Sequence, residues 1–562
     1  MEETSIFDAD IKNCVTNLAS IIRAERNRGL KPLATYAEPA LIDRFINVTN
    51  QVIFGRRGTG KTHLLLAVKE KLENSFPQNE NVVVYVDLSK VIPIIEETEE
   101  NKTEYSLLVI QSIMDEVINC VTDNIKKVYG VGFFGNATTA ESPKKQQLYD
   151  LLSIFNKELI EGREIKSLGK YRFSKEDVDN LNSSLSVSAT PKLDVGVSRQ
   201  SKRTTDSENI KYVSVADLHK LIKQFSSIIP GLQITILLDE FSEINKEIQP
   251  YLAALIKRVV ISANITVKIA AIPNRTNLQL RNDNIIGLEE GADIFGFHLD
   301  NRYVYEINKQ STKKFFNKLL ANHLHSIDDE TFPDDNFNVL DEFLAPQALN
   351  EILVATAGIP RDFLNIFINS YDNLLVNHTK VQKRISAKNI RTACRLWYTT
   401  DKKEQVEKNV IAHKLLNKIL EDIVIAKKSS HFLVPKDYSD IKAFQDLLDL
   451  RVLHLRKDNY SHQDNKGIIY NVYSVDYGSY NSLEVTKNSL STNSVEDIEI
   501  NVIDDLRKVR RISLGSDFFN KFLLEVGDGI KCKSKLCGNT IDTNSPPYLK
   551  KKLCNHCFEP VE

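Results

Sequence analysis

The sequence contains no apolar run that approaches the ~18–20 residues needed to cross a bilayer. Its first ten residues, MEETSIFDAD, are acidic, whereas a secretory signal begins with basic and then apolar residues. It also lacks an excess of charge, because 73 Lys and Arg nearly balance 75 Asp and Glu. We therefore expect a cytoplasmic protein without membrane contact, whose nucleic-acid contacts, if it makes any, come from local basic patches.

Cysteine is sparse, and the seven cysteines fall into two groups. Cys14, Cys120 and Cys394 stand singly in helical stretches, where we expect small buried apolar side chains. The other four cluster near the end of the sequence, and in a reducing compartment such a cluster favours a metal site over disulfides. With 42% hydrophobic and 26% charged residues the composition is globular, and 562 residues predict about three to five domains.

The strongest motif is GRRGTGKT at residues 55–62, which lies between a short apolar strand and a helix and matches G-x-x-x-x-G-K-[ST]. The glycines allow backbone N–H groups to surround phosphate oxygens, Lys61 reaches the β and γ phosphates, and the Thr62 hydroxyl binds Mg²⁺. The alternative is an ordinary glycine turn before a helix. The candidate nucleotide-binding residues are Gly55, Arg56, Arg57, Gly58, Thr59, Gly60, Lys61, Thr62 and His63.

A second half of the site is predicted at residues 233–240, where the apolar run QITILL ends in Asp239 and Glu240. This is a Walker B pattern. Asp239 would hold Mg²⁺ through water, and Glu240 would orient and deprotonate the attacking water. The alternative, solvated acids at the end of a strand, loses weight because the phosphate-binding motif is present.

Strand and helix patterns alternate around these motifs, at residues 82–88, 103–129 and 266–273. This alternation predicts an α/β fold with a parallel sheet covered by helices. Asn274 follows the third segment and is the candidate for contact with the γ-phosphate or the lytic water. No N-K-x-D element follows residue 240, which favours ATP over GTP.

In this order, the motifs resemble those of AAA+ ATPases of the initiator branch, which includes origin-recognition proteins and bacterial relatives. The resemblance covers roughly residues 31–400. Within it, AGIPRDFL at residues 357–364 resembles the start of the sensor 2 helix, which implies that Arg361 reaches the γ-phosphate from a helical lid. A surface arginine on a helix that begins with proline is the alternative. Residues 385–402 resemble a lid helix, with Ser386 as its N-cap.

The resemblance also implies a homo-oligomer in which a neighbouring subunit supplies an arginine to the site. Arg281 is favoured for this role over Arg258, Arg275 and Arg302 because it lies just beyond the third strand. Residues 136–211 exceed a minimal AAA+ core, and apolar residues alternate with polar ones there, which predicts a β-hairpin insertion. These apolar residues are Leu185, Val187, Leu193, Val195 and Val197.

The last third of the chain predicts two further modules. Helices at residues 406–426 and 438–450, then strands at 452–455 and 468–473, follow the order of a winged helix with its wing at 457–466. Arg451, Arg456, Lys457 and Lys466 could meet nucleic-acid phosphates there, and Tyr460 could stack on a base. Packing against a protein is the alternative.

The second module contains Cys532 and Cys537, then sixteen residues, then Cys554 and Cys557. This spacing predicts two knuckles that close one structural, tetrahedral Zn²⁺, with His556 as a bystander. Six lysines surround the knuckles and could face nucleic acid or a partner protein: Lys531, Lys533, Lys535, Lys550, Lys551 and Lys552.

The predicted organisation is an N-terminal helix (1–30), an AAA+ core (31–300), a helical lid (301–402), a winged helix (403–515) and a zinc ribbon (516–562). The leading hypothesis is an ATPase that couples ATP, Mg²⁺ and hydrolysis to DNA or partner binding. By resemblance, roles in mobile-element and anti-phage systems are among those implied. The alternative is a nucleotide-gated signalling scaffold whose C-terminal modules bind protein. A fused hydrolase or nuclease has little support, because neither an H-x-H metal set nor a Ser/His elbow is present.

Overall fold

The computed structural model describes residues 6–22, 32–76, 81–92, 102–128, 232–263, 265–281, 285–300, 302–333, 338–377, 382–461, 467–480, 512–534 and 536–561, with residue 509 and short pieces within 147–154, 163–166, 209–212 and 219–224. None of the helices in these segments is long and apolar enough to pass through a bilayer. The apolar residues of the predicted hairpin in the 136–211 insertion lie outside the described residues.

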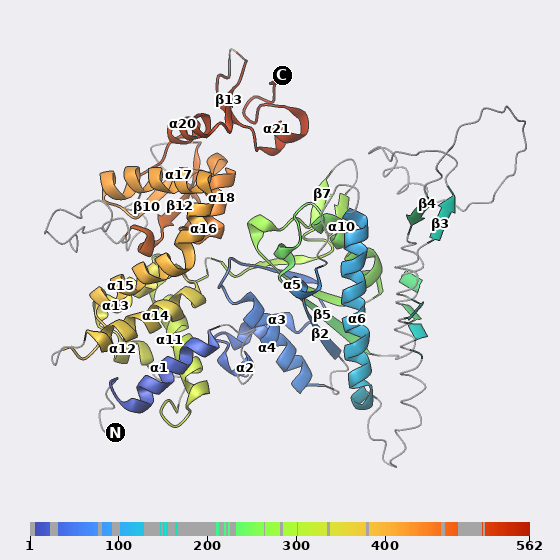
Figure 1. Cartoon of the computed structure of the whole chain (residues 1–562), viewed down its shortest axis with the longest axis horizontal. Helices are drawn as coiled ribbons and strands as arrows, with labels where there is room; N and C mark the ends of the chain where they lie inside the picture. Colours follow the sequence, from blue (N-terminus) through green and yellow to red (C-terminus); the bar gives the residue numbers. More distant parts are fainter. Residues whose placement is uncertain are drawn as a thin grey trace, which may run out of the picture.

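A five-stranded parallel sheet forms the centre of the region that carries the glycine loop and the acidic pair, as predicted (Figure 1). Its strands occur in the order β2 (Asn81–Asp87), β5 (Gln233–Asp239), β6 (Thr266–Ala271), β1 (Gln51–Phe54) and β9 (Phe295–His298). All four pairings are parallel, and β1, β2, β5 and β6 are almost entirely buried, which explains their continuous apolar runs, whereas the edge strand β9 is partly exposed. Because β6 alone separates β1 from β5, the glycine loop and the acidic pair emerge at the same edge of the sheet.

Helices cover both faces of this sheet (Figure 1). On one face, α2 (Pro32–Thr35), α3 (Pro39–Phe45) and α4 (Lys61–Asn74) form a core with the inward residues of β1 and β2. On the other, α6 (Lys102–Val128) and α10 (Gln249–Leu255) pack on Val52, Val84 and Ile236. Short elements complete this region: α5 (Leu88–Val91), β3 (Arg163–Lys166), β4 (Asn209–Tyr212), η3 (Phe241–Glu243), η4 (Ile256–Val260), η5 (Ile261–Ala263), η6 (Pro273–Arg275), β7 (Gln279–Arg281) and β8 (Ile285–Gly287).

Beside the sheet lies a bundle formed by α11 (Lys309–Ile327), α12 (Val339–Phe343), α13 (Pro346–Ala355), α14 (Pro360–Val376) and α15 (Ala387–Trp397) (Figure 1). The N-terminal helix α1 (Ala9–Ile21) packs against this bundle through Cys14, Val15 and Leu18. Ser386 caps α15 in a reciprocal capping box with Asn389, as the sequence predicts for its N-cap. One π turn, η7 (Tyr398–Lys402), leads from α15 into the C-terminal third.

The C-terminal third begins with α16 (Lys403–Lys408), α17 (Val410–Ile419) and the π turn η8 (Leu420–Ile425). The prediction of one continuous helix over residues 406–426 is therefore wrong. The chain breaks at Asn409, whose backbone is not helical and whose side-chain oxygen caps α17 by accepting the Ala412 N–H at 3.2 Å. The second predicted helix is shorter than expected, since η9 (Lys436–Tyr438) precedes α18 (Lys442–Asp449).

Three antiparallel strands follow in the order β10 (His431–Pro435), β12 (Ile469–Val475) and β11 (Leu453–Ser461). The sequence predicted β11 and β12 but missed β10, and residues 462–466 of the predicted wing lie outside the described residues. Beyond the sheet, α20 (Ser516–Val526) packs Phe519 against Tyr438 and Phe444. A small unit of β13 (Gly529–Lys531), β14 (Thr540–Asp542) and α21 (Pro546–Lys551) then carries the four clustered cysteines.

Candidate nucleotide and metal sites

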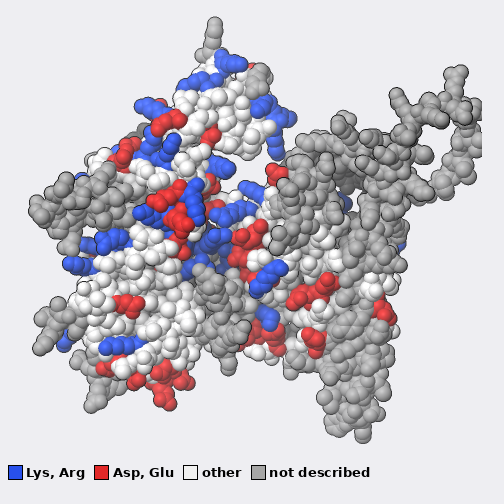
Figure 2. All heavy atoms as spheres, viewed as in Figure 1, with Lys and Arg blue, Asp and Glu red and all other residues white. Residues whose placement is uncertain are grey.

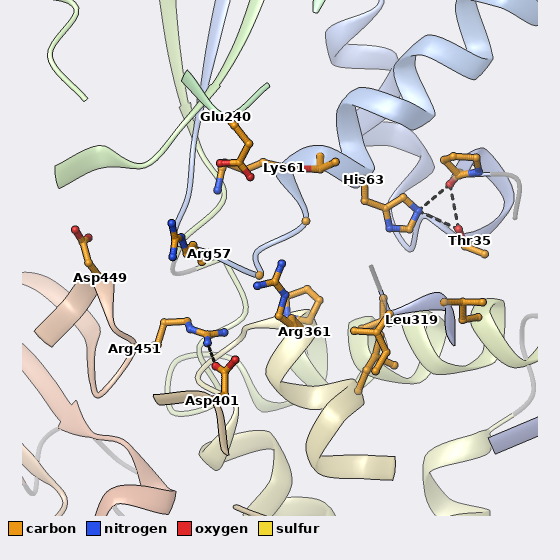
Figure 3. Close-up of a pocket in the computed structure, with 18 of the residues that line it drawn as sticks. Thr35, Arg57, Lys61, His63, Glu240, Leu319, Arg361, Asp401, Asp449 and Arg451 are labelled. Atoms are coloured by element: carbon orange, nitrogen blue, oxygen red, sulfur yellow. Dashed lines mark hydrogen bonds and ion pairs between the residues drawn. The ribbon is translucent and has the colours of Figure 1, made fainter. Parts of the chain in front are cut away.

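A cavity of about 340 Å³ lies where the loop after β1, the end of β5 and the start of α14 meet (Figure 3). Its lining includes Gly58, Lys61 and Thr62 of the glycine loop, Glu240 and Arg361. The two halves of the predicted site, far apart in sequence, therefore face a single space. The last residues of α18 and the turn that follows it close another side of this cavity.

The glycine loop has the backbone conformation that its motif requires. Gly58 and Gly60 have φ values of 85° and 93°, in the left-handed region that favours glycine. Lys61 lies at the start of α4, where its ammonium donates to the carbonyl oxygens of Gly55 at 2.8 Å and Arg56 at 3.2 Å. Burial lowers the pKa of Lys61, while the negative charges of Glu240 and Asp239 oppose that shift. A phosphate group could replace the two carbonyls as the partner of this cation.

The acidic pair at the end of β5 has two distinct environments. Asp239 is buried, and its carboxylate accepts the Tyr85 hydroxyl at 2.8 Å and the Glu240 N–H at 2.9 Å. Glu240 adopts a left-handed φ of 54°, a strained conformation for this residue type that is common at functional sites. Burial is the main cause that raises the pKa of Glu240, and the charge of Asp239 adds to it. A raised carboxyl pKa suits a general base.

Thr62 and Asp239 are the residues that could hold Mg²⁺. Thr62 lines the cavity, and the carboxylate of Asp239 is close enough to Lys61 to influence its pKa. Hydroxyl and carboxylate oxygens are the ligands that Mg²⁺ prefers, with water and phosphate oxygens completing the shell. The donor set therefore fits the metal.

The helical bundle meets the glycine loop directly. The Arg361 N–H donates to the Gly58 carbonyl at 3.2 Å, and a Cβ at Gly58 would lie 2.8 Å from the Arg361 Cβ. Glycine at position 58 is therefore needed for this approach as well as for its positive φ. Arg361 lines the cavity and contributes to the electrostatic environment of Lys61, so this arginine of the helical bundle and the loop lysine face the same space.

Four predicted residues do not line the cavity: Arg56, Thr59, Asn274 and Arg281. Arg56 is buried and bonds to Asp300 through both its N–H and its guanidinium, which also donates to His454 Nδ1 at 3.1 Å. The Thr59 hydroxyl donates to the Arg56 carbonyl at 2.8 Å. The Asn274 amide donates to an Asp449 oxygen at 3.4 Å. The neighbouring residue in the sequence, Arg275, is the one that lines the cavity. Arg281 ends β7, away from the cavity lining.

The other end of the cavity is mostly apolar. Ile21, Ile22, Leu319 and Leu364 line it together with His63, which follows Thr62 on α4. The His63 ring lies 2.9 Å from the Thr35 hydroxyl and 3.0 Å from the Pro32 carbonyl. The sequence predicted His63 but not the other residues, because only folding brings helices α1, α11 and α14 to this end. A base of the nucleotide could pack here.

The four clustered cysteines have the geometry of a tetrahedral metal site. Their sulfurs all lie within 4.8 Å of one another, with 3.7 Å between Cys532 and Cys557 and 3.8 Å between Cys537 and Cys554. A Zn²⁺ ion bound at ~2.3 Å by four thiolates requires sulfur separations of about 3.8 Å. The observed sulfurs therefore fit zinc, and His556 is not part of the group.

Basic side chains surround the cysteines on the surface. Lys531, Lys533, Lys550, Lys551 and Lys552 are all exposed, whereas Lys535 lies outside the described residues. Figure 2 shows Lys and Arg side chains on this unit at the top of the view. By contrast, Arg451, Arg456 and Tyr460 are buried. This corrects the prediction that they contact nucleic acid from the surface of the preceding module.

Comparisons with known proteins add little to this geometry. No family model matches the chain, and the search of curated proteins found no match. One solved structure that matches is that of the Aeropyrum pernix ORC1 protein in complex with DNA. It is 13% identical, with 80% of this chain and 92% of that chain covered, and its TM-score is 0.27. Because this score is too low to carry an argument, function must be inferred from the site itself.

Proposed function

We propose that this protein binds and hydrolyses ATP in an AAA+-type site and couples the nucleotide to contact with nucleic acid or a partner protein. One observation carries the proposal: the glycine loop, Glu240 and the lid residue Arg361 line a single cavity, with Asp239 buried beside it. A lone glycine loop would leave the chemistry open. A loop, a metal-binding acid, a base and a lid cation together are the set that phosphoryl transfer to water requires.

Each residue then has a definite task. Lys61 and Arg361 bind phosphate oxygens and neutralise the charge that develops on them. Thr62 and Asp239 would hold Mg²⁺, which would supply further charge neutralisation when bound. Glu240 accepts a proton from the attacking water, because its raised pKa makes the carboxylate more basic. The apolar end of the cavity near His63 accepts the base, and the absence of an N-K-x-D element favours adenine.

The central test replaces Glu240 with Gln, which keeps size and hydrogen bonding but removes the base. We expect ATP affinity to change by less than about 2-fold while kcat falls by at least about 100-fold. Lys61→Ala should instead abolish ATP binding. ATP binding by calorimetry and phosphate release measure the two effects.

Glu247→Gln is the matched control for this test, since Glu247 is an exposed acid of the same segment and does not line the cavity. Its ATPase rate should equal that of the unaltered protein. If Glu240→Gln hydrolysed ATP at the unaltered rate, the assignment of the base would be wrong.

For the C-terminal units we propose that the four cysteines bind one structural Zn²⁺ and that the lysines around them contact nucleic acid. The exposed lysines and the sulfur separations support this. A second candidate function, a nucleotide-gated scaffold that binds protein, is favoured by a different observation. Arg451 and Arg456, which a winged helix could use for phosphates, are instead buried in contacts within the chain.

A further inference from the structure

Three arginines that line the cavity are already engaged with carboxylates of the same chain. Arg57 pairs with Glu243 at 2.8 Å, Arg275 with Asp449 at 3.0 Å, and Arg451 with Asp401. Figure 2 shows this mixture of positive and negative side chains in the middle of the molecule. A guanidinium binds carboxylate and phosphate oxygens with the same planar set of donors. A triphosphate entering the cavity therefore competes with these acids.

Arg275 is the arginine best placed to exchange a carboxylate for a phosphate. It lies in η6, directly after β6, on the side of the cavity that carries Glu240. The Ser242 hydroxyl links η3 to the residues on both sides of η6. It accepts the Ile272 N–H at 2.6 Å and lies 2.9 Å from the Thr276 hydroxyl. The terminal phosphate must lie near Glu240 if Glu240 activates the attacking water.

The backbone of Arg275 is fixed, whereas its side chain is half-buried. Its carbonyl accepts the amide of Gln249 at 2.9 Å, and Gln249 is fully buried. The Arg275 side chain is 35% exposed, while the Asp449 side chain is only 7% exposed. A rigid backbone with a reachable guanidinium is the arrangement expected of a ligand-binding arginine. In the present structure the guanidinium of Arg275 is paired with the carboxylate of Asp449.

Asp449 belongs to the C-terminal third, whereas Arg275 belongs to the central sheet region, so their ion pair joins these two parts of the chain. It is the last residue of α18, packed beside the β10–β12–β11 sheet. The same part is tied to the lid by buried ion pairs of Lys402 with Asp476 at 2.6 Å and of Arg451 with Asp362 at 2.6 Å. Asp362 directly follows the lid arginine Arg361. Loss of the Arg275 contact would thus change how α18 meets the central sheet while its lid contacts remain.

We propose that Arg275 is a ligand of the terminal phosphate and that Asp449 competes with that phosphate for it, so that triphosphate binding loosens the contact between α18 and the central sheet. This inference rests on the proposed nucleotide site. It adds a phosphate-binding residue to that site, and it identifies a carboxylate of the C-terminal third as the group that the triphosphate displaces.

The test is a double-mutant cycle on ATP and ADP affinity, measured by calorimetry with Mg²⁺. Asp449→Asn keeps the shape of the side chain and removes its charge, so ATP affinity should rise by about 5- to 10-fold, with ADP affinity unchanged. Arg275→Gln should lower ATP affinity by about 10-fold. In the double variant, Asp449→Asn should add nothing to the effect of Arg275→Gln.

Asp446→Asn is the matched control, since Asp446 lies one turn earlier on α18, bonds to Asn409 at 2.8 Å and does not line the cavity. It should leave ATP affinity unchanged. Arg275→Lys keeps the charge, so it should recover part of the affinity that Arg275→Gln loses, even if the Gln variant folds poorly. Thermal unfolding of each variant identifies loss of structure.

Several outcomes would overturn the inference. ATP affinity that does not rise in Asp449→Asn, a gain that persists in the Arg275→Gln background, or equal gains for ATP and ADP would each show that Arg275 and Asp449 do not compete in this way. The proposed nucleotide site would survive all three, because the unaltered protein would still bind ATP. Failure of the unaltered protein to bind ATP would remove both proposals.

Discussion

Two histidines, His63 and His323, line the proposed nucleotide site, and the buried ring of His454 bonds to Arg56 of the glycine loop. Burial lowers the pKa of His63 to about 3, of His323 to about 4 and of His454 to about 3. His454 shows what the neutral ring does: one nitrogen accepts from Arg56 at 3.1 Å and the other donates to Asp476 at 3.3 Å. A protonated ring would lose the bond to Arg56, since both of its nitrogens would then be donors.

These histidines make the folded protein sensitive to acid. The unfolded chain takes up a proton on each histidine near pH 6.5, whereas the folded protein does so only near pH 3 to 4. Because their pKa values are lowered by folding, these histidines do not reduce the free energy of unfolding above pH 6.5. They reduce it progressively as the pH falls from 6.5 towards the pKa values of the folded protein. Each should lower the free energy of unfolding by about 2 kcal/mol between pH 7 and pH 5. Urea titrations at the two pH values measure this.

His323→Gln is the variant that isolates one histidine. It removes one titrating ring, so the loss of stability between pH 7 and pH 5 should shrink by about 2 kcal/mol relative to the unaltered protein. The comparison uses the difference between two pH values, so any general destabilisation by the substitution cancels. Equal pH dependence in the two proteins would contradict a neutral His323 in the folded state.

At the scale of helices and strands, local sequence patterns predicted some elements well. The sheet strands β1, β2, β5 and β6 and helices α4 and α6 occur where apolar periodicity and motifs indicated. The break at Asn409 and the strand β10 were missed, because one is a cap inside an amphipathic pattern and the other is a short segment that is buried throughout and shows no alternation. Periodicity over short segments cannot resolve either feature.

In the candidate site, too, residues in local motifs could be predicted, whereas contacts between distant segments could not. Lys61, Thr62, Asp239 and Glu240 could be predicted because their motifs are local. The pairing of Arg275 with Asp449 joins residues 174 positions apart, and no spacing rule marks it. Arg451 was expected at the surface as a basic residue that could meet nucleic-acid phosphates, but it is buried beside carboxylates from three distant segments: Asp362, Asp401 and Asp476.

The four-cysteine unit offers a prediction at this scale, because its core is too small to fold without a metal. That core consists of Cys532, Ile541, Cys554 and Val561. We expect one zinc per chain, and Cys554→Ser or a strong chelator should release it and unfold residues 529–561 while α20 stays packed through Phe519. Metal analysis and hydrogen exchange measure the two effects.

Cys120→Ser is the control for the zinc experiment. Cys120 is a half-buried cysteine of α6, and its thiol donates to the Val83 carbonyl at 3.4 Å, far from the cluster in the fold. This variant should keep its zinc. Retention of one zinc per chain by Cys554→Ser would show that the four sulfurs do not form the site.

Over the whole molecule, the distribution of charge matters more than its sum, since the net formal charge is only −2. Where the helical bundle, the central sheet and the C-terminal third meet, many basic side chains are already paired with carboxylates of the same chain. Lys402, Arg275 and Arg451 are examples. The lysines near the cysteines remain exposed. If this protein binds nucleic acid, these lysines are therefore the surface on which phosphate contacts should be found.

Exchange of Lys550 and Lys551 for Glu tests this surface. Both lie in α21, so their loss should weaken duplex DNA binding and reduce the slope of log affinity against log salt by about 2, one unit for each lost phosphate contact. Fluorescence anisotropy over a range of salt concentrations measures both quantities. The matched control exchanges Lys403 and Lys408 of α16, which are also exposed and give the same change in net charge. Equal loss of DNA affinity in the two variants would show that the lysines act only through the overall charge of the protein and make no specific phosphate contact. If DNA binding is absent or does not depend on salt, the protein-binding scaffold is favoured instead.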